Sequence, residues 1–124
     1  MKLTYAVERL LDTGWTSSMN MDLERLPDGR PYPSVLSVQR DFSQAGLELS
    51  IKQNLMFGCF RATWAPAGEP LDPSAHTDER HGTVIGDCDR EAAVYALAQL
   101  RNAQMEHQFA NAQPMASFDL VEAR

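Results

Sequence analysis

The sequence has little cysteine and no long apolar run. Its 124 residues include two cysteines, Cys59 and Cys88, which are too few for the disulfide framework of a small secreted scaffold. No apolar run approaches the roughly 20 residues that a membrane-spanning helix needs. Charged side chains enter residues 1–15 too early for a secretory signal peptide. We therefore expect a cytoplasmic protein with reduced thiols and no membrane partner.

Sequence fingerprints of common enzyme sites are also missing. The chain contains no G-x-S-x-G, no H-E-x-x-H, no Walker lysine motif and no glycine-rich dinucleotide fingerprint. Its carboxylates are scattered singly through polar stretches, and no spacing brings two of them together as an acid–base pair. The sequence therefore predicts no catalytic residue, no metal and no cofactor.

Basic residues are outnumbered by acidic ones. The chain has 11 Lys and Arg against 17 Asp and Glu, which gives a formal net charge of −6. Such a balance opposes non-specific contact with nucleic acid and with anionic membranes. The length and the 44% hydrophobic content suit one globular core. We expect a single domain for which nucleic acid is not the main partner.

The spacing of apolar residues predicts three helices. Apolar side chains recur at intervals of three and four within residues 3–11, 35–45 and 89–108. Ser34 precedes the second of these segments as an N-cap, and Gly46 follows it as the residue that ends the helix. The third segment is the longest and is predicted to begin directly after a turn.

Strict alternation of apolar and polar residues predicts three strands. The alternating segments are residues 47–52, 59–64 and 83–85. The sequence NLMFG at 54–58 predicts a turn or bulge between the first two strands. Residues 65–82 hold several prolines and a charged run, which predicts a long polar loop.

The order of these elements predicts an α+β domain. A three-stranded antiparallel sheet carries two helices on one face, in the order α-β-β-β-α, and an additional helix precedes them. The chain forms one domain, 1–124. Within it, 1–33 form the N-terminal helix and a polar, turn-rich loop, 34–108 form the core, and 109–124 form a tail.

The segment CDREAA at 88–93, followed by Leu97, resembles the last helix of the double-stranded RNA-binding domain. In that family the helix opens with a Ser-Lys-Lys-Glu-Ala type segment after a glycine-rich turn, and continues with paired alanines and a leucine. The likeness spans residues 33–100 and implies the same α-β-β-β-α fold.

The same segment differs from the family at the residues that bind RNA. The family's lysines at the start of this helix contact phosphates, next to the positive end of the helix. This chain has Asp87 and Asp89 there, and Arg90 is the cation that remains. The two carboxylates stabilise the helix but repel phosphate. The resemblance therefore implies the fold without the RNA function, and an RNA- or nucleoprotein-associated module is the alternative hypothesis.

Two further features have both a chemical and a structural interpretation. Cys88 lies at a helix N-terminus, as either an activated thiolate or a small capping or packing residue, and the aspartates on either side oppose the thiolate. His76 and His81 lie among carboxylates in the loop at 65–82, which is either a metal site or a solvated loop. Because zinc sites need three or four braced ligands, we expect the solvated loop. A small enzyme or metal-binding protein using this loop is the third hypothesis.

Three aromatic residues, Phe57, Phe60 and Trp64, lie near one strand pair. Aromatic side chains on a sheet either stack on nucleobases or pack in the core. Stacking on nucleic acid requires basic neighbours, and Lys52 and Arg61 are the two nearby cations. We therefore predict that these aromatics pack beneath the helices.

The last helix carries apolar residues around most of its circumference. Its alanines and leucines predict contact with the sheet, whereas Val94 and Tyr95 lie on another flank. The first helix, the tail at 109–124 or a partner chain could cover that flank. We predict an interaction surface at Val94, Tyr95, Phe118 and Leu120. The expected function is that of a non-catalytic module that acts by protein association, with a homo-oligomer as the leading possibility.

Overall fold

The computed structural model describes most of the chain. Backbone is described for residues 2–18, 21–74 and 76–119, and side chains for residues 3–18, 21–74 and 76–108. The elements are α1 (Lys2–Asp12), β1 (Leu23–Arg25), β2 (Pro31–Pro33), α2 (Val35–Gln44), β3 (Leu47–Asn54), β4 (Cys59–Pro66), β5 (Gly82–Gly86) and α3 (Asp89–Asp119).

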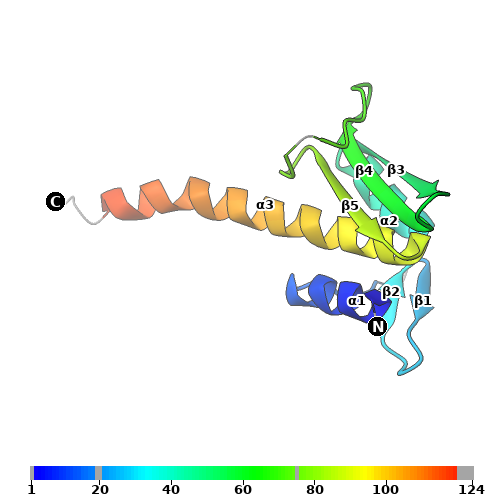
Figure 1. Ribbon diagram of the computed structural model, residues 1–124. Coiled ribbons are helices and arrows are strands. Elements are labelled where there is room, and N and C mark those ends of the chain that lie inside the picture. The colour runs from blue at the N-terminus through cyan, green and yellow to red at the C-terminus, as the bar shows by residue number, and fades with distance from the viewer. Residues whose placement is uncertain (1, 19–20, 75, 120–124) are drawn as a thin grey trace.

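Strands β3, β4 and β5 form an antiparallel sheet in that order. Helices α2 and α3 pack against each other and against the sheet, as Figure 1 shows. The predicted α+β class and the three-stranded antiparallel sheet are therefore confirmed. Helix α1 packs on α3 on the side away from the sheet, so the molecule has a third layer.

The centre of the core is Trp64 of β4, whose side chain is 1% exposed. Its ring packs edge-to-face against Phe42 of α2, with ring centroids 5.5 Å apart and an interplanar angle of 62°. Gly82 of β5 is the strand partner of Trp64. A Cβ atom at Gly82 would lie 2.1 Å from Cζ2 of Trp64, so the indole lies directly over glycine backbone. The prediction that Phe60 and Trp64 pack inward is confirmed, with Phe60 partly buried against the core.

A small hairpin, β1 and β2, lies within the region 16–33 where we expected only a loop. Its turn closes through a hydrogen bond from the Gly29 amide to the Leu26 carbonyl (2.8 Å). The prolines of β2 do not prevent pairing because they occupy an edge strand, where a missing N–H is tolerated. Between them Tyr32 is 2% exposed and belongs to the core.

The start of α2 is fastened to this hairpin region by Asp22. The Ser34 hydroxyl donates to Oδ2 of Asp22 (2.9 Å) and accepts the Ser37 amide (3.1 Å). The Ser37 hydroxyl donates to the Asp22 carbonyl (2.9 Å). The predicted N-cap at Ser34 is confirmed, and Gly46 ends the helix with φ of +79°.

Helix α1 supplies the second cover for α3. Val94 is 0% exposed and belongs to the common core, and Tyr95 packs edge-to-face against Tyr5 of α1 with centroids 6.2 Å apart. Arg101 of α3 donates to the Thr13 hydroxyl (2.8 Å) and to the Thr13 carbonyl (3.3 Å), which satisfies acceptors at the end of α1. Val94 therefore has no surface to offer a partner chain, which corrects the predicted interaction surface at that position.

Helix α3 continues to Asp119, so the predicted helix end near Gln108 is wrong. The residues immediately after position 108 include alanines and glutamine, which have high helix propensity and extend the helix. Phe118 lies within this helix, and its side chain is outside the described part. Leu120, the other predicted interaction residue of the tail, lies outside the described residues altogether.

We expect Gly82→Ala to destabilise the fold by about 1–3 kcal/mol, because the added methyl group forces the buried Trp64 ring out of its position. Urea unfolding followed by tryptophan fluorescence measures the loss. Ile85→Val, on the same strand but half exposed, is the control and should change stability by less than about 0.5 kcal/mol. Equal stability of Gly82→Ala and wild type would contradict the packing described here.

Candidate functional site

The N-terminus of α3 is occupied by the protein's own groups. The Glu91 amide donates to Sγ of Cys88 (3.4 Å), and the Asp87 amide donates to a carboxylate oxygen of Glu91. This resembles a capping box with a thiol in the place of a hydroxyl, except that Glu91 accepts the amide of Asp87 rather than that of the capping residue Cys88. The predicted capping role of Cys88 is confirmed, and the amides of Asp87, Arg90 and Glu91 are hydrogen bonded to side chains of the protein itself.

Arg90, the single cation expected at this helix start, pairs with Glu24 of β1 (3.5 Å). The Tyr32 hydroxyl donates to the same carboxylate oxygen (3.2 Å). Burial raises the pKa of Tyr32, and the negative charge of Glu24 raises it further. The three side chains connect the β1–β2 hairpin to α3, so Arg90 has a structural partner.

The loop between β4 and β5 satisfies many of its polar groups internally. Oδ1 of Asp78 accepts the amides of Arg80 and His81 (2.7 Å each), and Nε2 of His81 lies 3.3 Å from Glu69. Among the side chains of residues 3–18, 21–74 and 76–108, no three from His, Cys, Asp or Glu are placed to hold a metal ion. The described side chains therefore hold no candidate metal site, although Asp72, His76, Asp78 and His81 line one open depression of the loop.

Among the large apolar side chains that the structure describes, those of the β3–β4 turn have the highest exposed fractions. Leu55 and Met56 are each 84% exposed and Phe57 is 76% exposed. Oδ1 of Asn54 accepts the amides of Met56 (3.0 Å) and Phe57 (3.3 Å), so the backbone of the turn is held without help from these side chains. The prediction that Phe57 packs in the core is wrong, because it lies in the turn, beyond the end of the strand.

Leu55 adjoins the face of the sheet that α2 and α3 leave uncovered. A shallow groove runs there from the turn across the strands, lined by Lys52, Gln53, Asn54, Leu55, Cys59, Arg61 and Ile85. Ile85 of β5 is 51% exposed and extends the apolar surface. We call Leu55, Met56, Phe57 and Ile85 the hairpin surface. The name refers to the hairpin formed by β3 and β4, not to the small β1–β2 hairpin.

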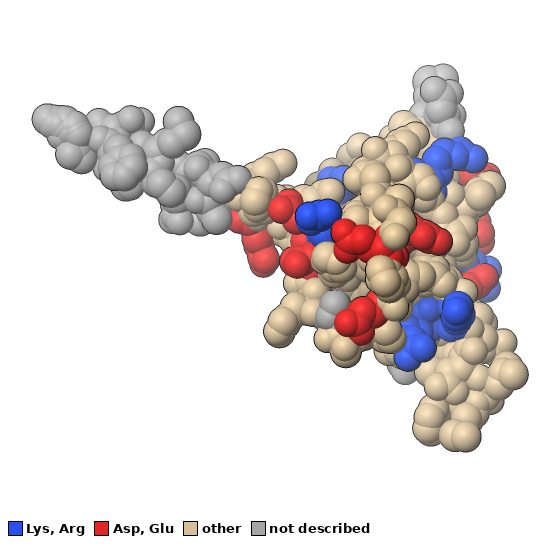
Figure 2. All heavy atoms as spheres, turned by 90° about the horizontal axis from the view of Figure 1, so that it is seen from above, with Lys and Arg blue, Asp and Glu red and all other residues tan. Residues whose placement is uncertain are grey.

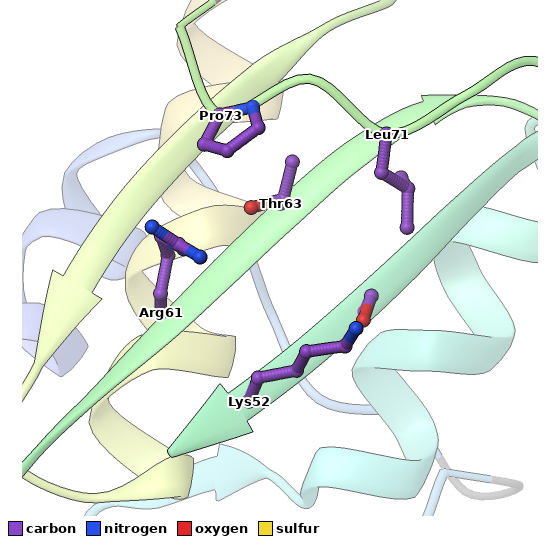
Figure 3. A pocket seen from close by; sticks show the side chains of 6 residues that line it. Lys52, Arg61, Thr63, Leu71 and Pro73 are labelled. Carbon is purple, nitrogen blue, oxygen red and sulfur yellow. The ribbon is translucent and has the colours of Figure 1, made fainter. Parts of the chain in front are cut away.

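A second depression on the same face lies further from the turn. Figure 3 shows Lys52 on β3 and Arg61 and Thr63 on β4, with Leu71 and Pro73 of the following loop above them. Ser50 completes the lining of a pocket of about 90 Å³. We call it the basic pocket.

Charge is unevenly distributed around this face. Figure 2 shows basic side chains gathered beside a protrusion that carries no charge, although the chain as a whole is acidic. Of the residues predicted as an interaction surface, Val94 is buried and Tyr95 packs against Tyr5 of α1, so neither is part of this face. The run of three apolar residues in a predicted turn was the sequence signal for this site.

Comparison with known proteins gives no relative. No protein-family profile matches the chain, and neither a curated protein nor a solved structure is detectably similar to it. Among the helices of the described residues, none combines the length and the apolar character required to cross a bilayer.

The thiol cap predicts a difference between two substitutions. Cys88→Ser keeps an acceptor for the Glu91 amide and should be at least as stable as wild type, whereas Cys88→Ala should lose about 0.5–1 kcal/mol. Urea unfolding monitored by circular dichroism measures both. Equal losses in the two variants would mean that side-chain size, not hydrogen bonding, matters at this position.

The raised pKa of Tyr32 predicts a specific pH dependence. The folded state holds the phenolic proton more tightly than the unfolded chain, so this contribution to stability is complete below the unfolded pKa of about 10 and is lost at higher pH. The difference in unfolding free energy between wild type and Tyr32→Phe should therefore shrink as pH rises above about 10. The same measurement on Tyr5→Phe, at a half-exposed site, serves as control. A difference that stays constant from pH 8 to about 11 would contradict this role of Tyr32.

Proposed function

We propose that the protein is a non-catalytic cytoplasmic module that acts by protein association, and that it associates with a second copy of itself. The observation that carries the proposal is the hairpin surface. Three consecutive apolar side chains, each at least 76% exposed, make no contribution to the core cluster. Contiguous exposed apolar surface on a folded protein is typical of a binding site.

The free energies of apolar burial and of association favour a symmetric dimer. Burying one large apolar side chain contributes about 1.5–3 kcal/mol, whereas association costs about 4–15 kcal/mol in lost freedom of motion. A single turn therefore supports weak binding at most. A two-fold dimer doubles the buried surface, because each copy brings the same residues to the contact.

The free thiols of Cys59 and Cys88 are compatible with a reducing compartment.

Association with RNA is the second candidate. The order α2-β3-β4-β5-α3 is the order that the resemblance to the double-stranded RNA-binding domain implies. Against RNA binding, Asp87 and Asp89 flank the helix start, and Arg90 is paired with Glu24. The cations that remain for RNA on the open face of the sheet are Lys52 and Arg61.

Replacing Leu55, Met56 and Phe57 together by serine should abolish self-association without loss of stability, because these side chains make no core contacts. Light scattering over a concentration series should show a mass that rises with concentration for wild type and a constant monomer mass for the variant. Leu36→Ser is the matched control, since Leu36 is 57% exposed on α2 and should leave association intact.

The same series separates the candidates. A wild type that stays monomeric throughout rules out self-association, and a triple variant that associates like wild type rules out the hairpin surface. Retention of duplex RNA at about 50 mM salt, where phosphate contacts are strong, would favour the second candidate instead.

A further inference from the structure

The basic pocket places two cations directly opposite each other. Lys52 and Arg61 are cross-strand partners in the β3–β4 ladder. Like charges at such positions are destabilising by about 0.2–1 kcal/mol. Figure 3 shows the two side chains extending in different directions, which reduces their repulsion. Within the part of the chain that the structure describes, neither of them forms an ion pair, although acidic residues outnumber basic ones in the sequence.

The other polar groups of the pocket are hydroxyls. Thr63 is 6% exposed, and its Oγ1 accepts the hydroxyl of Thr83 (3.1 Å), which leaves its own hydrogen available to donate. Ser50 on β3 adds a second hydroxyl to the lining. Among the described residues no carboxylate lines the pocket, so its polar groups are hydrogen-bond donors around two positive charges.

The loop above the pocket gives it depth. Leu71 and Pro73 form an apolar wall over the sheet, as Figure 3 shows. The backbone beside them is fixed by Asp72, whose Oδ1 accepts the amide (3.0 Å) and the hydroxyl (2.7 Å) of Ser74. An apolar wall excludes water from one side, which strengthens charge-assisted hydrogen bonds made inside.

We propose that the basic pocket binds a single oxyanion group of the carboxylate or phosphate class. The ammonium of Lys52 and the guanidinium of Arg61 supply the charge, and the hydroxyls of Thr63 and Ser50 supply neutral donors. An anion between the two cations converts their repulsion into two attractions. The pocket is small and partly open to solvent, so one such group fits inside it with the rest of the molecule outside. This binding goes beyond the proposed association and does not depend on it.

The charge pair makes the test specific. In chloride buffer of low ionic strength, Lys52→Gln should raise the melting temperature by about 1–4 °C, because it removes the repulsion. Millimolar inorganic phosphate should raise the melting temperature of wild type by a few degrees over chloride of equal ionic strength. Lys52→Gln and Arg61→Gln should lose most of this response to phosphate.

Arg40→Gln is the matched control, because Arg40 is exposed on α2 and is not among the residues that line the pocket. It should respond to phosphate like wild type. An equal response in all four proteins, or none in wild type, would overturn the proposal. Saturable shifts of the Ser50 and Thr63 amide resonances on addition of phosphate provide a readout that does not depend on melting.

The oxyanion is either a free small anion or an acidic side chain of a second copy. The two sources are distinguished by whether anion binding changes when the protein associates. Measurements on the triple serine variant of the hairpin surface test the pocket in a protein without that surface, so failure of the association proposal leaves this test intact. If the group is a free small anion, phosphate and acetate bind equally well at low and high protein concentration. If it is an acidic side chain of the second copy, their binding weakens as wild type associates.

Discussion

The contact between Trp64 and Gly82 is the constraint on which the rest of the structure depends. Because β5 presents bare backbone opposite the indole, the largest side chain of the core fits between the sheet and α2. That packing places both helices on one face and leaves the other face to the β4–β5 loop. The basic pocket lies on this second face together with Leu55 and Ile85 of the hairpin surface, and Lys52 and Arg61 line both of its depressions.

Sequence periodicity correctly predicted the helices and strands whose apolar spacing and capping residues match the way they pack in the fold. The change from helical spacing to alternation at Gly46 correctly separated α2 from β3. The N-cap at Ser34 and the thiol cap at Cys88 followed from residue type and position, and both are present. These features depend on a few neighbouring residues, so a single sequence carries enough information to place them.

Features that depend on distant contacts were not predictable in this way. Tyr32 is buried because the β1–β2 hairpin and the start of α3 meet around it, although its local sequence indicates a loop. Val94 is fully buried within the chain itself, whereas the sequence left open a partner chain as its cover. The basic pocket depends on a polar loop folding back over β3 and β4, which no periodicity encodes. Phe57 was assigned to the core because aromatic residues near strands usually belong there.

The length of α3 has a consequence for how the molecule moves through solution. At 31 residues the helix is about 46 Å long, whereas a compact chain of this size has a radius of gyration of about 14 Å. Figure 1 shows its C-terminal part extending beyond both the sheet and α1. Such a rod increases frictional drag, so the monomer diffuses and elutes from a sizing column like a heavier globular particle. An apparent Stokes radius therefore overstates the number of copies in the particle.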